Sequence, residues 1–149
     1  MKKILSKSVS QTEKIANALA KNSKGTEIIA LYGDLGAGKT CFTKGLTKAL
    51  KVNTDDVHSP TFTLLNEYNG KYKIYHFDMY RINSFEELYS LGFFDFIENG
   101  IIITEWSENI DKFLPENAIK VHIEYCQNEN ERILTIENCE VDFNEDISD

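Results

Sequence analysis

The spacing of apolar residues along this chain of 149 residues predicts three helices. The first is expected over residues 11–21, behind a capping box at 10–13, because apolar residues there lie three or four apart: Ile15, Ala18 and Leu19. A second helix is expected where four apolar residues line one side: Phe42, Leu46, Ala49 and Leu50. A further capping box at 84–87 predicts a third helix that reaches Tyr89 or beyond.

Strands are predicted by two other patterns. The apolar runs 27–32 and 101–104 are continuous, which is typical of strands buried on both faces of a parallel sheet. Four further runs alternate or are rich in β-branched and aromatic residues, and they pair as two hairpins: 61–68 with 71–77, and 119–125 with 132–138. Asn69-Gly70 lies between the first two runs, and both residues tolerate positive φ in a tight turn.

A strand that feeds a glycine-rich turn and then a helix, with buried strands later in the chain, indicates an α/β fold. The hairpins make its central sheet mixed, with helices flanking it. The length suits one domain over residues 1–149, and five acids among the last ten residues predict a frayed acidic tail from about residue 140.

The charge is uneven along the chain. Lys and Arg total 16 against 24 Asp and Glu, for a net charge of −8, yet residues 1–50 carry nine Lys and only three acids. This distribution indicates either an acidic solvated surface or a polarised molecule whose basic end takes phosphates or an acidic partner. The overall negative charge disfavours autonomous binding to nucleic acid, so no DNA partner is expected.

The cysteines and apolar runs indicate the cellular setting. Three cysteines without C-x-x-C spacing, Cys41, Cys126 and Cys139, favour neither a disulfide framework nor a structural zinc site. No run is long enough to span a bilayer, and the N-terminus lacks the apolar stretch of a secretory signal. We therefore expect a reduced, cytoplasmic protein without a membrane partner.

The sharpest chemical signal is the segment Gly33-Asp34-Leu35-Gly36-Ala37-Gly38-Lys39-Thr40, which fits the phosphate-binding loop G-x-x-x-x-G-K-[ST]. Glycines let successive N–H groups point at one anion, and the following helix adds its positive end. Lys39 would neutralise the β- and γ-phosphates, and Thr40 would offer a hydroxyl to Mg²⁺. Cys41 follows in the first turn and is either an activated thiol or a small packed residue.

Hydrolysis also needs carboxylates for Mg²⁺ and for the attacking water. Asp78 and Glu105 each end an apolar run, where strands of α/β folds meet the ligand crevice, and the spacing does not decide which one holds the metal directly. Ser59-Pro60-Thr61 resembles a switch segment, although it also fits an ordinary strand-entry turn. Arg81 is either a charge stabiliser or a surface residue, and the three histidines lack metal-ligand spacing.

Four motifs in one order resemble the TsaE (YjeE) family of bacterial P-loop ATPases: the segment 33–40, Ser-Pro-Thr-Phe-Thr at 59–63, His-Phe-Asp-Met-Tyr-Arg at 76–81 and Thr-Glu-Trp at 104–106. The resemblance covers nearly the whole chain. It implies ATP/ADP and Mg²⁺ binding with slow hydrolysis, in support of threonylcarbamoyladenosine (t6A) formation in tRNA. TsaD and TsaB would be the partners, tRNA would be involved indirectly, and hydrolysis would reset their complex.

The resemblance also implies roles for individual residues. Thr40 and Glu105 would lie on the magnesium side, and Asp78 would assist the phosphate, the water or the metal. The remaining nucleotide contacts would include Thr12, Cys41, Thr61, Trp106 and Arg132. Met79, Ile82 and Cys41 depart mildly from common family residues, and none of them touches the proposed chemistry.

Three other functions are alternatives to the ATPase. A small-molecule kinase needs Arg clusters on a lid, and this chain has only Arg81 and Arg132. A GTPase needs Asn-Lys-x-Asp, which the sequence lacks. A binding module that nucleotide merely orders stays open, because slow turnover would resemble it.

Overall fold

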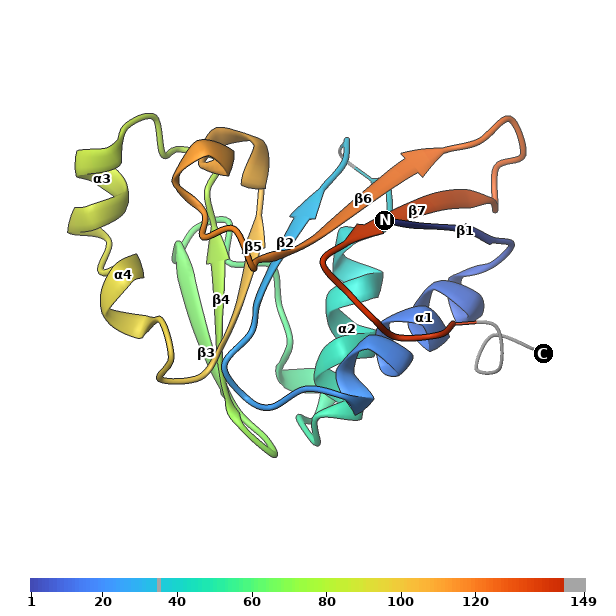
Figure 1. The fold of residues 1–149 in the computed structure, drawn as a ribbon, viewed down its shortest axis with the longest axis horizontal. Helices are drawn as coiled ribbons and strands as arrows, with labels where there is room; N and C mark the ends of the chain where they lie inside the picture. The colour runs from blue at the N-terminus through green and yellow to red at the C-terminus, as the bar shows by residue number, and fades with distance from the viewer. Residues whose placement is uncertain (35, 144–149) are drawn as a thin grey trace.

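The computed structural model describes residues 1–34 and 36–143, and its seven strands form one mixed sheet (Figure 1). The order across the sheet is β1-β7-β6-β2-β5-β4-β3. The strands are β1 (Lys2–Ser6), β2 (Ile28–Tyr32), β3 (Leu65–Asn69), β4 (Lys73–Asp78), β5 (Ile101–Glu105), β6 (Ile119–Tyr125) and β7 (Arg132–Glu137). β6, β2, β5 and β4 run parallel, and antiparallel neighbours extend both sides. The expectation of an α/β fold with a mixed sheet is confirmed.

Helices cover both faces of the sheet. They are α1 (Val9–Lys21), α2 (Lys39–Ala49), α3 (Phe85–Ser90) and α4 (Phe93–Phe96), with the short 3₁₀ turns η1 (Thr54–Asp56), η2 (Ser107–Asn109) and η3 (Asp111–Phe113). Figure 1 shows α1 and α2 together on one side of the sheet and α3 and α4 on the other. Within the described residues, none of these helices has the length and apolar character that crossing a membrane would need.

The core follows the two-residue alternation of the central strands. Ile29 and Leu31 of β2 pack in the cluster under α1 and α2, whereas Ile28 of the same strand belongs to the cluster under α3 and α4. The residues of β5 alternate in the same way: Ile103 packs in the cluster under α1 and α2, and Ile102 packs in the cluster under α3 and α4. All five residues of β2 and of β5 are buried, as the continuous apolar runs predicted.

The first helix begins earlier than its sequence suggested. α1 starts at Val9, and its N-cap is Ser8, whose side chain accepts from the backbone N of Gln11. The helix cap predicted at Ser10 was therefore wrong by two residues, because Ser8 offers the same side-chain hydroxyl two residues earlier. β1 was not predicted, since a five-residue strand with one buried residue has little apolar pattern of its own.

The β3–β4 hairpin exists, but with a shorter first strand and a longer loop than expected. Asn69 pairs with Lys73, which leaves three residues in the loop, and neither Asn69 nor Gly70 has a positive φ. Residues 61–64 form a turn rather than strand, because Leu64 has φ 66° and its N–H donates to the Pro60 carbonyl at 2.7 Å. The turn places residues 59–63 outside the sheet, beside the carboxyl ends of β4 and β5.

The C-terminal segment is packed further than the acidic composition indicated. Phe143 is only 3% exposed within the cluster under α1 and α2, and Val141 packs against that cluster. The Lys2 ammonium donates to the Val141 carbonyl. The expected frayed tail therefore does not include residues 140–143, and the rest of it, 144–149, lies outside the described residues.

Candidate functional site

The loop between β2 and α2 has the backbone that anion binding requires. Gly33, Gly36 and Gly38 adopt φ values of 150°, 80° and 116°, which L-residues with a Cβ rarely adopt. A Cβ on Gly33 would lie 2.6 Å from the Ile123 carbonyl oxygen, so the loop start is also sterically reserved for glycine. Gly38 is the N-cap of α2 in the left-handed region, which directs the helix N-terminus at the loop.

Lys39 lies inside this loop rather than in solvent. Its side chain is largely buried, and its Nζ donates to the Gly33 carbonyl at 2.6 Å. The same Nζ lies 4.2 Å from the centroid of the Trp106 ring, a cation–π distance. The ammonium is thus held over the site by one carbonyl and one ring, both of which a phosphate oxygen can replace.

A cavity of about 280 Å³ joins the loop to residues far away in sequence. Its walls come from the loop and α2, from the segment before β3, and from the carboxyl ends of β4 and β5: Gly36, Gly38, Lys39, Thr40, Ser59, Thr61, Asp78, Glu105 and Trp106. Every one of these residues lies in a motif that the sequence singled out. The structure therefore brings the loop, both carboxylates and Thr61 to one place.

The two carboxylates are buried neighbours on adjacent parallel strands. Asp78 and Glu105 are register partners of β4 and β5, and their exposures are 3% and 6%. Asp78 Oδ1 accepts from the Tyr80 N–H at 2.8 Å. Glu105 Oε2 lies 2.9 Å from His76 Nε2, in a pair that is almost fully buried. Each carboxylate keeps a second oxygen for which the structure gives no protein hydrogen bond within the described residues.

His76 is the site residue that the sequence reasoning missed. The sequence predicts a structural role for it, because the three histidines lack metal-ligand spacing. It lies two residues before Asp78 on the same strand, and so on the same face of the sheet. That two-residue offset was the available signal, since a side chain at this position points toward whatever occupies the end of the neighbouring strand.

Trp106 follows Glu105 in a conformation that is unusual for an aromatic residue. Its φ of 56° lies in the left-handed region, and it is the N-cap of η2. The Tyr80 ring packs against its ring in a tilted arrangement, with centroids 5.0 Å apart and an interplanar angle of 59°. A non-glycine residue with positive φ costs free energy and is characteristic of functional sites, where surrounding contacts hold it.

A second cavity, of about 140 Å³, lies on the other side of the loop. Thr12, Cys41 and Arg132 line it together with Gly36, Ala37 and Gly38. Arg132 Nε donates to the Ala37 carbonyl at 3.0 Å, so β7 supports the loop directly. Thr12 is buried, and its hydroxyl is 2.7 Å from that of Ser6. The loop thus separates the carboxylate-lined cavity from a second cavity that contains Thr12, Cys41 and Arg132, three of the residues expected to contact the nucleotide.

The Cys41 thiol is not activated by its place at the start of α2. Burial raises its pKa to about 11, and the charge of Glu13 acts in the same direction, outweighing the opposite effect of Lys44. Of the two interpretations of this cysteine, the structure supports the small packed residue.

Two expected or candidate residues, Asp34 and Arg81, lie elsewhere. Asp34 is exposed and lines a different hollow, while its carbonyl accepts from the Ala37 N–H at 3.0 Å. Leu35 lies outside the described residues. Arg81 is exposed on the surface beyond β4.

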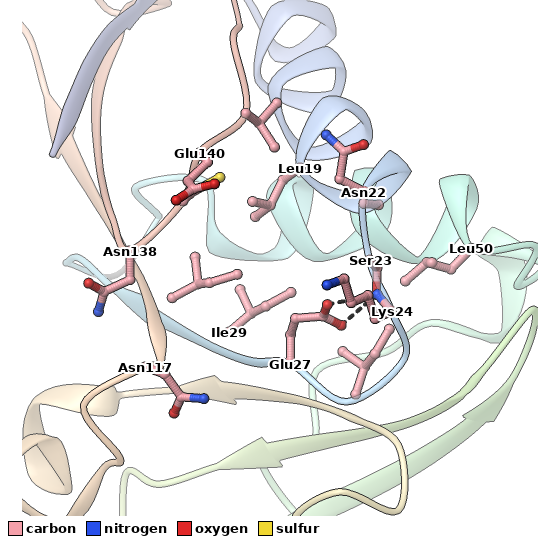
Figure 2. Close-up of a pocket in the computed structure, with 15 residues that line it drawn as sticks. Leu19, Asn22, Ser23, Lys24, Glu27, Ile29, Leu50, Asn117, Asn138 and Glu140 are labelled. Carbon is pink, nitrogen blue, oxygen red and sulfur yellow. Dashed lines mark hydrogen bonds between the residues drawn. The ribbon is translucent and has the colours of Figure 1, made fainter.

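A larger cavity, of about 540 Å³, lies at the opposite edge of the sheet (Figure 2). Its walls include Glu27, Ile101 and Ile119, at or beside the starts of β2, β5 and β6, whereas ligands of α/β sheets bind at the carboxyl ends. Figure 2 shows the Glu27 carboxylate bonded to the Ser23–Lys24 turn, so its charge holds the loop that precedes β2. We therefore assign the site to the smaller, loop-lined cavity.

The donor set at that cavity fits Mg²⁺ only in combination with a bound phosphate. Thr40, Asp78 and Glu105 supply a hydroxyl and two carboxylates, which are hard oxygen donors. In residues 1–34 and 36–143, no group of three or more His, Cys, Asp or Glu side chains is arranged to hold a metal ion by itself. Magnesium sites of this kind use one or two carboxylates and the substrate's phosphates instead of a complete protein cage.

Comparison with known proteins agrees with the motifs. The family model for "Threonylcarbamoyl adenosine biosynthesis protein TsaE" matches residues 6–134. Two relatives are named tRNA threonylcarbamoyladenosine biosynthesis protein TsaE. The protein from Rickettsia prowazekii is 42% identical over 89% of this chain and 94% of its own length. The protein from Aquifex aeolicus is 46% identical over 83% of this chain and 96% of its own length.

A solved structure extends the likeness to the fold. The crystal structure of Bacillus subtilis YdiB matches with a TM-score of 0.70 at 32% identity, over 91% of this chain and 83% of that one. A family model that covers most of the chain, together with relatives above 40% identity, shows that the protein belongs to the TsaE family.

Proposed function

We propose that this protein binds ATP with Mg²⁺ at the loop-lined cavity and hydrolyses it slowly, in support of the threonylcarbamoyl transfer that makes t6A in tRNA. The observation that carries the proposal is one cavity shared by Lys39, Thr40, Asp78 and Glu105. Relatives above 40% identity are named for t6A biosynthesis, which supports the same pathway for this chain. The setting would be cytoplasmic, with tRNA involved indirectly.

The loop and Lys39 would bind the triphosphate. Backbone N–H groups of residues 36–40 and the α2 N-terminus favour an anion there. Lys39 would exchange its contact with the Gly33 carbonyl for phosphate oxygens. The nucleoside would extend toward the second cavity, with Thr12, Cys41 and Arg132 at its walls.

Thr40, Glu105 and Asp78 are the residues that would hold Mg²⁺, and the metal would neutralise the developing charge on the phosphates. Glu105 would bind the metal through Oε1, because its Oε2 is hydrogen-bonded to His76 Nε2. Asp78 orients the attacking water in this scheme, with its carboxylate fixed by the Tyr80 N–H.

Partner proteins would complete the site. Ser59 and Thr61 line the cavity but belong to an exposed turn, and their hydroxyls bond to each other at 2.8 Å. A turn on the surface is poorly held for catalysis, so docking of TsaD and TsaB would fix it and raise turnover. Hydrolysis would then reset the complex between rounds of transfer.

The decisive experiment measures phosphate release from ATP by the protein alone and with TsaD and TsaB. Slow turnover alone and faster turnover with the partners is the expected result. Lys39→Ala should abolish nucleotide binding, measured by the fluorescence of Trp106, the only tryptophan, because its ring contacts the Lys39 ammonium. Lys48→Ala, on the exposed side of α2, is the matched control.

Glu105→Gln separates the ATPase from a binding module that nucleotide merely orders. The ATPase requires loss of turnover with nucleotide binding retained, since removing one charge-stabilising group typically costs about 10²–10³ in kcat. If Glu105→Gln supports t6A formation at the wild-type rate in the presence of the partners, the result would support the binding module and refute the proposed hydrolysis. Glu67→Gln, an exposed carboxylate on β3, is the control.

A further inference from the structure

A line of buried polar contacts leads from Glu105 away from the proposed nucleotide site. Glu105 Oε2 is 2.9 Å from His76 Nε2, and His76 Nδ1 is 3.0 Å from the Tyr68 hydroxyl. The Tyr68 hydroxyl donates to the His58 carbonyl at 3.0 Å. Glu105, His76 and Tyr68 are between 2% and 6% exposed, so water does not compete for these bonds.

The sheet fixes the order of these contacts. Tyr68 pairs with Ile74 on β4, which makes it the diagonal neighbour of His76 two residues further on. A histidine ring can bridge two partners because its nitrogens lie on opposite edges. With Nε2–H donated to Glu105, the single Tyr68 hydrogen has two acceptors, His76 Nδ1 and the His58 carbonyl.

The far end of this line is the segment that enters the cavity. His58 directly precedes Ser59, and Ser59 and Thr61 line the cavity that Glu105 also lines. Asn66 of β3 donates to the same His58 carbonyl at 3.0 Å, and the Thr63 hydroxyl donates to Asn66. The segment 58–63 is therefore attached to β3 at both ends, and the bond from Tyr68 connects that attachment to Glu105.

We propose that His76 and Tyr68 are positioning residues that couple the Glu105 carboxylate to segment 58–63, so that nucleotide and Mg²⁺ at the site order this segment. The coupling rests on the proposed ATP site. When Glu105 shifts toward a cation, His76 follows it, and the Tyr68 hydrogen moves between its two acceptors. Segment 58–63 and the Glu105 carboxylate then respond to each other through the side chains of His76 and Tyr68.

Tyr68→Phe tests the coupling, because it removes one hydroxyl and leaves the ring. Hydrogen–deuterium exchange of the intact protein is measured with and without ATP·Mg²⁺. Wild type should show slower exchange in residues 58–63 and in the loop when nucleotide is bound. Tyr68→Phe should bind nucleotide within about twofold of wild type and protect the loop, yet lose at least half of the protection at 58–63.

Tyr75→Phe is the matched control: it lies on β4, is 6% exposed, and faces the other cluster. It should behave as wild type in every measurement. With partners present, Tyr68→Phe should lower kcat while the KM for ATP stays unchanged, a split that general destabilisation would not give. Full nucleotide-dependent protection of 58–63 in Tyr68→Phe would overturn the coupling.

His76 variants test the other half of the line. His76→Leu removes both bonds, and we expect the Mg²⁺ concentration for half-maximal Trp106 response to rise about 10-fold or more, as when a ligand loses its supporting partner. His76→Gln keeps a donor for Glu105 and should restore most of that response without restoring protection at 58–63. Restoration of both would refute the role of Tyr68. A wild type that binds no nucleotide would instead refute the proposed function, and the coupling with it.

Discussion

The Lys39 ammonium and the Trp106 ring hold each other in place at the mouth of the proposed phosphate site. The ring can lie there because Trp106 takes a left-handed φ of 56°, which turns the chain sharply after Glu105. The ammonium reaches the ring because its stem is buried beneath the loop. The strained backbone of Trp106, directly after the buried Glu105, thus directs the indole face at Lys39.

Cys41 shows how burial overrides a sequence motif at the scale of one residue. With its pKa raised to about 11, the thiol is protonated at neutral pH and is a poor nucleophile. We expect the iodoacetamide alkylation rate of Cys41 to rise about tenfold per pH unit between pH 7 and 9. Peptide mass spectrometry of protein quenched at intervals measures this rate.

The competing expectation gives a different profile. If the α2 N-terminus dominated, the thiol would titrate well below its ordinary pKa of 9.0, and the rate would level off within that window. A plateau before pH 9 would contradict the burial argument.

The contact between α1 and α2 depends on a small residue at one position. A Cβ on Gly45 would lie 2.8 Å from Ala16 Cβ and 2.8 Å from the Glu13 carbonyl oxygen. Gly45→Ala should therefore destabilise the protein by about 1–2 kcal/mol, because overpacking outweighs the helix propensity that Ala gains. Urea unfolding measures the change, and Lys44→Ala at the exposed neighbouring position should stay within about 0.5 kcal/mol of wild type.

The turn between α1 and β2 depends on the charge of Glu27. Burial alone would raise the pKa of this carboxyl, but hydrogen bonds from the Lys24 N–H, the Ser23 hydroxyl and nearby backbone N–H groups lower it below its ordinary 4.5. A lowered folded pKa stabilises the fold above about pH 4.5, and that contribution is lost as the pH falls below it.

Glu27→Gln should accordingly reduce the free energy of unfolding by about 1 kcal/mol at pH 7. The difference from wild type should shrink as the pH falls from 5 to 3, where wild type loses the same charge. Thermal or urea unfolding across this range measures it. A difference that does not depend on pH would show that shape, and not charge, is what Glu27 supplies.

The sequence predicts a structural feature correctly where a single short segment determines that feature. The apolar runs of β2 and β5, the Ser84 cap of α3 and the phosphate-binding loop all depend on neighbours within a few residues. β1 and the contact of His76 with Glu105 depend on pairing between distant strands. The pattern of β1 alone does not encode its pairing with β7, and the two-residue offset of His76 from Asp78 indicates a shared face of the sheet but not which residue of β5 lies opposite.

At the scale of the whole molecule, the N-terminal strand contacts both β7 and the segment that follows it. β1 is an edge strand that pairs only with β7 among the described residues, and the segment after β7 returns across α1 and α2. Lys2 contacts this returning segment twice, through the Val141 carbonyl and the ring of Phe143, whose centroid is 5.7 Å from Nζ. Lys2 thereby joins β1 to the segment 141–143, and β7 in turn carries Arg132 to the loop.

Phe143 should consequently matter far more than its place near the end of the chain suggests. Phe143→Ala removes a buried ring, and we expect a loss of about 2–4 kcal/mol in unfolding free energy. Phe62→Ala makes the same change at a side chain that is 90% exposed and should leave stability nearly unaltered. Because the ring contacts Lys2 at the start of β1, hydrogen exchange in β1 should quicken in Phe143→Ala before exchange in β2 does. Equal stability of the two variants would mean that residues 140–143 only rest on the core and that β7 alone holds β1 in the sheet.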